Sequence, residues 1–77
     1  MTLSEAQTKT NLKITYIESD DDIRRKLLSM GIHINELLIK VNDNKFGPVL
    51  VLNPLYGLTK LALDRELAEK IQVEYEN

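Results

Sequence analysis

The chain contains no cysteine and no tryptophan, and it has little proline, glycine or other aromatic material. Without cysteine, disulfide bonds, thiolate metal sites and cysteine nucleophiles are all excluded. Its longest apolar runs are far shorter than the roughly 20 residues that a membrane helix needs. The opening residues, MTLSEAQTKT, are polar and do not resemble a signal peptide. We therefore expect a soluble protein, compatible with a reducing cytoplasm.

The charge balance is mild and does not favour nucleic acid as a partner. Ten basic residues against 12 acidic ones give a net charge of -2. A dedicated nucleic-acid binder would normally carry a basic patch or a high pI. The few aromatic residues, Tyr16, Phe46, Tyr56 and Tyr75, also leave little for stacking on RNA bases. A small-barrel RNA binder is therefore disfavoured.

The 77 residues suffice for one small domain, which we take to span residues 1–77. The composition is 43% hydrophobic but only 5% aromatic, so the core must be aliphatic. A chain of this size can spare few apolar side chains from its core. An exposed leucine cluster would therefore indicate a contact surface.

The first half of the chain predicts a strand followed by a helix. Residues 1–10 are weakly patterned, so we expect them to be weakly ordered or a short helix, with the ordered core at 11–75. Leu12, Ile14 and Tyr16 alternate on one face of a strand. In the SDDD stretch, Ser19 or Asp20 can cap the helix that follows.

The same helix is predicted to end at Gly31. Its apolar stripe places Leu27 in the core. If Gly31 adopts a left-handed conformation, Ile32 follows immediately and contacts Leu27, as is usual at such helix ends. Asn35 tolerates positive φ and therefore predicts a tight turn.

The second half predicts strands at 36–43, 48–53 and 58–64, then a short helix capped by Asp64, then a strand at 71–76. In the first of these, Leu37, Ile39 and Val41 are expected to face inward. The fold class is therefore mainly β with two short helices. We predict a small, partly open barrel of about five strands, with a helix after the first strand.

No pattern in the sequence indicates an enzyme, a metal centre or a cofactor. There is no glycine-rich phosphate loop and no plausible Ser-His-Asp set. His33 is the only histidine and is most simply a turn residue with an exposed ring. Asp20, Asp21 and Asp22 could bind a hard cation, but they lack the spacing of a calcium loop and fit a helix cap better. A binding module is the default class.

The stretch NPLYGL is unusual because Leu55 and Tyr56 occupy an expected polar turn. They could fold back over the mouth of the barrel. Alternatively, they could form a contact patch for another protein, with the tyrosine as an amphipathic anchor.

Three stretches together resemble one family. These are LLSMGI at 27–32, FGPVLV at 46–51 and ALDRELAEKIQV at 62–73. In this order they resemble the ferrous iron transport protein A family (FeoA-like domains), over roughly residues 11–75. One departure is Ile34-Asn35, where the family usually has Pro-Gly. Asn35 can replace the backbone role of that glycine.

The resemblance implies an SH3-like β-barrel and a non-enzymatic cytoplasmic accessory of bacterial ferrous iron transport. It would act on the cytoplasmic GTP-binding domain of the ferrous iron permease. The sequence leaves the oligomeric state open, with a monomer favoured. The contact residues that we select for this docking are Leu28, Met30, Ile32, Leu55 and Tyr56.

An alternative is a metal-responsive regulatory domain, related to the C-terminal domain of iron-dependent repressors. It would sense Fe²⁺ through His33 and the carboxylates at 20–22. Sites for such metals generally need more than one nitrogen or sulfur ligand, which disfavours this alternative.

Overall fold

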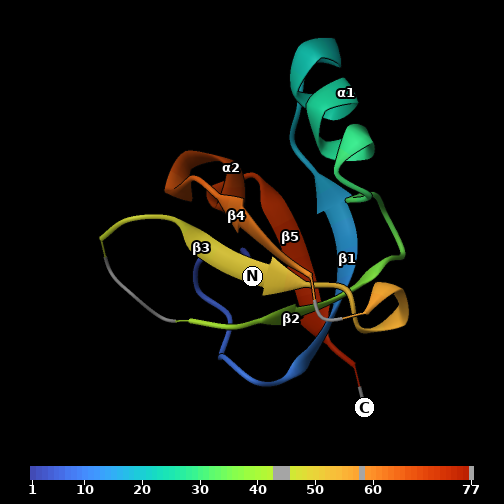
Figure 1. Ribbon diagram of the computed structural model, residues 1–77. Helices are drawn as coiled ribbons and strands as arrows, with labels where there is room; N and C mark the ends of the chain where they lie inside the picture. The colour runs from blue at the N-terminus through green and yellow to red at the C-terminus, as the bar shows by residue number, and fades with distance from the viewer. Residues whose placement is uncertain (43–45, 58, 77) are drawn as a thin grey trace.

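The computed structural model describes residues 1–42, 46–57 and 59–76 (Figure 1). Along the chain, the elements are β1 (Asn11–Ile17), α1 (Asp21–Ser29), β2 (Leu37–Lys40), β3 (Val49–Leu52), the single-turn 3₁₀ helix η1 (Pro54–Tyr56), β4 (Lys60–Leu63), α2 (Arg65–Glu69) and β5 (Ile71–Tyr75). The predicted order of strands and α-helices is confirmed. The turn that carries Leu55 and Tyr56 is the added element η1.

The five strands form one antiparallel sheet in the order β4-β3-β2-β1-β5. In a flat sheet the two edge strands would lie about 19 Å apart. Only residues 64–70 connect these edges, and the helix α2 within them is only about 7.5 Å long. The sheet therefore curls so that α2 can connect its two edge strands, β4 and β5. This curled sheet is the small barrel that the strand order predicts.

The interior of the barrel is aliphatic, as the composition requires. The buried cluster consists of Leu3, Ala6, Leu12, Ile14, Leu27, Ile32, Leu38, Val49, Val51, Leu63, Ala68, Ile71 and Val73. Every strand contributes to it, and so do α1, α2 and the N-terminal segment. Fully burying one aliphatic side chain contributes about 1.5–3 kcal/mol, so this cluster is the main source of stability.

Both ends of α1 are closed as the sequence predicts. At its start, Asp20 Oδ1 accepts a hydrogen bond of 2.9 Å from the Ile23 N–H. At its end, Gly31 has φ +78°. The Ile32 N–H donates to the Leu27 carbonyl at 2.9 Å and the Gly31 N–H donates to the Leu28 carbonyl at 3.0 Å. This pair of bonds, with Ile32 and Leu27 both in the core, is the expected left-handed helix stop.

The prediction that Tyr16 faces inward is wrong, because β1 contains a β-bulge. Ile14 pairs with Val73, but Tyr16 pairs with Gln72, so one extra residue is inserted into β1 between these pairs. Such an insertion reverses the faces of the residues that follow. Tyr16 is consequently 57% exposed, while Ile17 packs against the core.

The predicted inward face of β2 is also wrong. Leu38 and Lys40 are buried, whereas Leu37, Ile39 and Val41 are only partly buried. The inward lysine is 1% exposed. Its Nζ donates to the carbonyl oxygens of two residues of the N-terminal segment, Ser4 at 2.8 Å and Ala6 at 2.9 Å. Hydrogen bonds of this kind compensate the cost of burying a charged group.

The same contacts correct the expectation of a weakly ordered N-terminus. Leu3 is fully buried and Ala6 is 2% exposed. The segment also runs beside β5, where the Leu3 N–H donates to the Ile71 carbonyl at 2.8 Å and the Val73 N–H donates to the Met1 carbonyl at 2.9 Å. Residues 1–6 therefore close one end of the barrel and cover part of the β5 edge.

Candidate partner-docking surface

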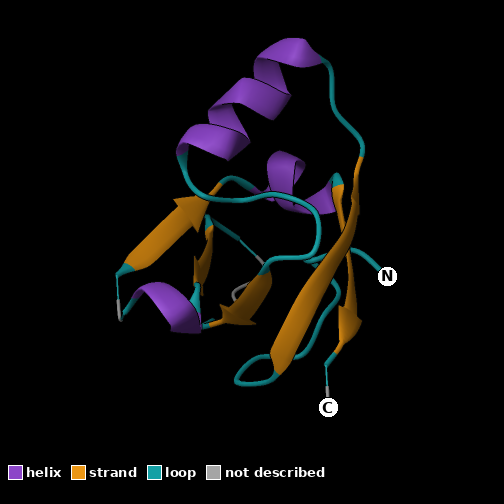
Figure 2. Ribbon diagram, turned by 90° about the vertical axis from the view of Figure 1, so that its right-hand side faces the viewer, coloured by secondary structure: helices purple, strands orange, loops and turns teal. Residues whose placement is uncertain are grey.

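Two apolar grooves flank the connection between α1 and β2. The first groove has a volume of about 400 Å³, and its walls come from the end of α1, η1, β2 and β4. The second groove, of about 270 Å³, lies between α1, the end of β1 and the residues after Gly31. Figure 2 shows the C-terminal end of α1 and the short helix η1 on the same side of the molecule, where the first groove lies between them.

Four of the five predicted contact residues line one or both of these grooves, and Leu55 lines neither. Met30 and Tyr56 line the first groove, and Leu28 lines the second. Leu55 lies on η1 beside Tyr56. Ile32 is only 1% exposed because it forms the core side of the α1 stop, so it lies beneath this surface although it lines both grooves.

Leu55 and Tyr56 do not fold back into the barrel. Their side chains are 71% and 70% exposed, although Tyr56 also lines the first groove. Of the two interpretations of the NPLYGL stretch, the structure therefore favours an exposed patch. Large apolar side chains held together at a surface are typical of an interaction site.

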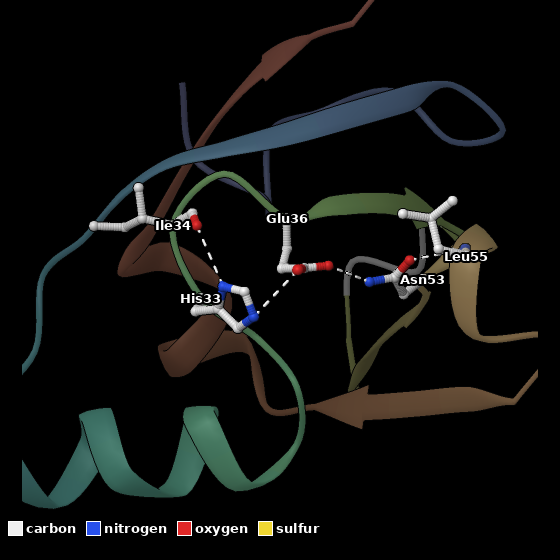
Figure 3. Close-up of polar contacts among 5 residues, drawn as sticks. All are labelled: His33, Ile34, Glu36, Asn53 and Leu55. Carbon is white, nitrogen blue, oxygen red and sulfur yellow. Dashed lines mark hydrogen bonds and ion pairs between the residues drawn. The ribbon is translucent and has the colours of Figure 1, made fainter.

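A chain of polar contacts holds η1 against the start of β2 (Figure 3). His33 Nε2 lies 3.1 Å from Glu36 Oε1. Glu36 Oε2 accepts a hydrogen bond of 2.6 Å from Asn53 Nδ2, and Asn53 Oδ1 accepts one of 2.9 Å from the Leu55 N–H. The carboxylate of Glu36 thus connects the residues after α1 to the cap of η1.

The backbone at the β2 side of this chain of contacts is fixed by bonds to β1. Asn35 has φ 74°, as its residue type allows, and its N–H donates to the Ile14 carbonyl at 2.8 Å. The Ile14 N–H in turn donates to the Glu36 carbonyl at 2.9 Å. Leu55 and Tyr56 are therefore presented from a braced turn rather than from a loose loop.

The role of Glu36 was missed at the sequence level. Asn53 before Pro54 is a recognisable cap signal, because proline favours the first position of a helix. Glu36 carries no such local signal, since its partner Asn53 lies 17 residues further along the chain.

The proposed Fe²⁺ ligands are not brought together. Asp20, Asp21 and Asp22 lie at the start of α1, whereas His33 follows its end in the chain, after a helix about 13 Å long. Among residues 1–42, 46–57 and 59–76, no three or more His, Cys, Asp or Glu side chains are grouped to hold a metal ion. The nearest acidic partner of His33 is instead Glu36, within the network that braces η1.

Comparison with known proteins decides the family. The model of the FeoA domain matches residues 1–75. The chain belongs to the FeoA domain family. This membership confirms the resemblance seen in the three sequence stretches. It also places the chain among the accessory proteins of ferrous iron transport, which are generally non-catalytic.

Solved structures share the fold over nearly the whole chain. A crystal structure of the iron uptake regulatory protein FeoA is 22% identical, with a TM-score of 0.86 and coverage of 99% of this chain and 97% of the other. FeoA of Stenotrophomonas maltophilia, an SH3 domain protein crystallised with zinc, is 28% identical, with a TM-score of 0.74 and coverage of 96% and 89%. The SH3-like fold is thereby confirmed.

The same fold occurs within a larger protein. The manganese regulator SloR matches with a TM-score of 0.82 at 13% identity, over 99% of this chain but 34% of SloR. This likeness concerns the fold alone. No curated protein matches the chain significantly. In the described part of the chain, no helix has the length and apolar character needed to cross a membrane.

Proposed function

We propose that this protein is a non-enzymatic cytoplasmic accessory that docks onto the cytoplasmic GTP-binding domain of the ferrous iron permease. Docking biases the nucleotide or gating state of that domain. The contact surface consists of Leu55 and Tyr56 on η1, Met30 at the end of α1 and Leu28 at the neighbouring groove. Ile32 supports this surface from the core.

The observation that carries the proposal is the exposure of Leu55 and Tyr56 on a braced turn. An ordered, largely exposed leucine–tyrosine pair costs solvation free energy that a monomer does not recover. A partner that covers both side chains recovers it. Because the Glu36 and Asn53 contacts already fix η1, little conformational entropy is lost on binding.

The first groove provides the geometry for an anchor from the partner. Its volume of about 400 Å³ accommodates one or two apolar side chains, and Tyr56 is one of the residues that line it. Apolar anchors that enter such pockets commonly dominate the binding energy of an interface.

The experiment is an amide NMR titration of the labelled protein with the unlabelled GTP-binding domain of the permease. We expect shifts clustered at residues 28–34 and 53–57. The double variant Leu55→Ser/Tyr56→Ser should weaken binding by at least about tenfold, as expected for two interface anchors. Its fold should persist because neither side chain is buried.

The matched control is Phe46→Ser. Phe46 is 90% exposed but precedes β3, whereas η1 follows it, so the two lie at opposite ends of that strand (Figure 1). This variant should bind as the unmodified protein does. Equal weakening in both variants, or an unshifted spectrum at saturating domain, contradicts the proposal.

The Fe²⁺ sensor is tested in a parallel anaerobic titration. If the chain senses iron directly, shifts should appear at His33 and at residues 20–22, and His33→Ala should abolish them. The separation of these residues along α1 disfavours this outcome. Shifts with the GTP-binding domain alone support the docking accessory.

A further inference from the structure

We propose that the second groove is a separate docking site for a short acidic segment of a partner protein, one in which an aliphatic side chain stands next to an aspartate or glutamate. This site shares Leu28 with the contact surface proposed above, but its occupant and its test do not involve the permease. It does not require the proposed action on the permease to be correct.

The floor of the second groove is aliphatic and partly exposed. Leu28 from the last turn of α1 is 50% exposed, and Ile34 from the following connection is 49% exposed. Ile17 and Ile32 complete the floor between them. A chain with so few apolar residues to spare thus leaves two large aliphatic side chains at one concave surface, which is typical of an interaction site.

This exposure is built into the backbone. Leu28 is held by the helix stop, in which its carbonyl accepts the Gly31 N–H at 3.0 Å. Ile34 precedes Asn35, whose left-handed conformation and 2.8 Å bond to the Ile14 carbonyl direct the chain across β1. The two side chains therefore stay in place without a ligand, which lowers the entropic cost of filling the groove.

The rim of the groove determines the charge of the occupant. It is formed by Ser19, Arg24 and His33, and no carboxylate of the described residues lines it. The single ion pair among described side chains joins His33 to Glu36, so Arg24 has no carboxylate within 4 Å there. A guanidinium that is free to form two parallel hydrogen bonds favours a carboxylate partner.

The acidic residues nearest to Arg24 in the chain do not occupy this rim. Asp20 uses its carboxylate to cap α1 through the Ile23 N–H, and Asp21 and Asp22 are exposed in the first turn of the helix. Arg25 and Lys26 are exposed on α1 but do not line the groove. The apolar floor therefore suits one aliphatic side chain of the partner, and Arg24 suits a carboxylate next to it.

Three capped peptides test the proposal by NMR titration: Ser-Asp-Leu-Asp-Ser, Ser-Asn-Leu-Asn-Ser and Ser-Asp-Ala-Asp-Ser. The first should bind weakly and shift the amides of Arg24, Leu28, His33 and Ile34. Loss of the carboxylates should weaken binding about two- to fivefold, the range for an exposed ion pair. Loss of the leucine side chain should weaken it about tenfold.

Two variants of α1 form a matched pair. Arg24→Gln should reduce binding of the acidic peptide to the level of the asparagine peptide. Arg25→Gln removes the same charge from the adjacent exposed position and should leave binding unchanged. Ile34→Ser should abolish binding of all three peptides, and its spectrum should show that the fold is retained.

Several outcomes overturn the proposal. These are no shifts at any of the groove residues, equal affinity for the three peptides, or equal losses in the two arginine variants. Co-sedimentation with phosphatidylglycerol vesicles that depends equally on Arg24, Arg25 and Lys26, without any peptide response, would assign the helix to a membrane surface and also refute the peptide site.

Discussion

A leucine is buried at one end of the barrel, and another is exposed at the other end. At the N-terminal end, Leu3 is fully buried within a segment whose carbonyls accept hydrogen bonds from the buried Lys40. At the end that carries η1, Leu55 is 71% exposed although its backbone N–H donates to Asn53 Oδ1 at 2.9 Å. The comparison teaches that polar contacts serve different purposes at the two ends. At one end they seal the core, and at the other they present apolar side chains to solvent.

The largest expected difference comes from truncating a leucine at each end. Leu3→Ala should lower the free energy of unfolding by about 2–5 kcal/mol, because it leaves a cavity in the core. Leu55→Ala should change it by no more than about 0.5 kcal/mol, since the side chain is mostly in water. Urea denaturation of both variants measures the difference. Similar losses would mean that η1 packs as part of the core.

The Lys40→Met variant tests whether the hydrogen bonds of Lys40 fasten the N-terminal segment to the core. The methionine keeps much of the apolar stem but leaves the carbonyls of Ser4 and Ala6 without this donor. We expect a loss of about 1–3 kcal/mol, the usual cost of unsatisfied buried groups. Lys26→Met on the exposed face of α1 is the control and should be nearly neutral. If the two variants were equally stable, Lys40 would not fasten the N-terminal segment.

The Asn53→Ala variant tests the hydrogen bonds that hold η1 in place. It removes the hydrogen bond to the Leu55 N–H and the donor to Glu36, and should cost about 1 kcal/mol, as loss of a helix cap usually does. Amide hydrogen exchange at Leu55 and Tyr56 should accelerate while exchange in β1 and β5 stays slow. Unchanged exchange at Leu55 would show that Pro54 alone fixes the turn.

The smallest effect concerns Glu5 in the N-terminal segment. Hydrogen bonds from the backbone N–H and the hydroxyl of Thr2 hold the pKa of the Glu5 carboxyl below its ordinary value. Its contribution to stability is therefore present above the ordinary pKa and is lost as the pH falls through the lowered value. Glu5→Gln should be slightly less stable at neutral pH, with the difference vanishing in acid. A thermal melting series against pH tests this sign.

Features that depend on neighbouring residues could be predicted from the sequence. The Asp20 cap, the stop at Gly31 and the positive φ of Asn35 each follow from a few adjacent residues and short-range bonds. The Asp64 cap is of the same kind, since its Oδ1 accepts the Leu67 N–H at 2.8 Å. Short apolar runs between turn residues also sufficed to place the five strands of the described residues.

Features that depend on distant contacts could not be predicted. The bulge in β1 is a property of its pairing with β5, and a single strand gives no sign of it. The alternation in β2 favoured Leu37, Ile39 and Val41 as the inward face, since the carbonyl partners that hold Lys40 inward lie 34 and 36 residues away. The contact between Glu36 and Asn53 was not predicted for the same reason, because 17 residues separate them in the chain. Of the candidate surface, the exposed pair on η1 was recognised, but the groove beside it was not.

The position of Ile32 has a consequence for how the two grooves respond to ligands. Its side chain lines both of them, so it acts as a shared partition. If a ligand in one groove displaces the Ile32 side chain, the volume of the other groove changes as well. Linkage then requires that each ligand alter the affinity of the other by the same factor. Two partners bound in the two grooves would then change each other's affinity through Ile32.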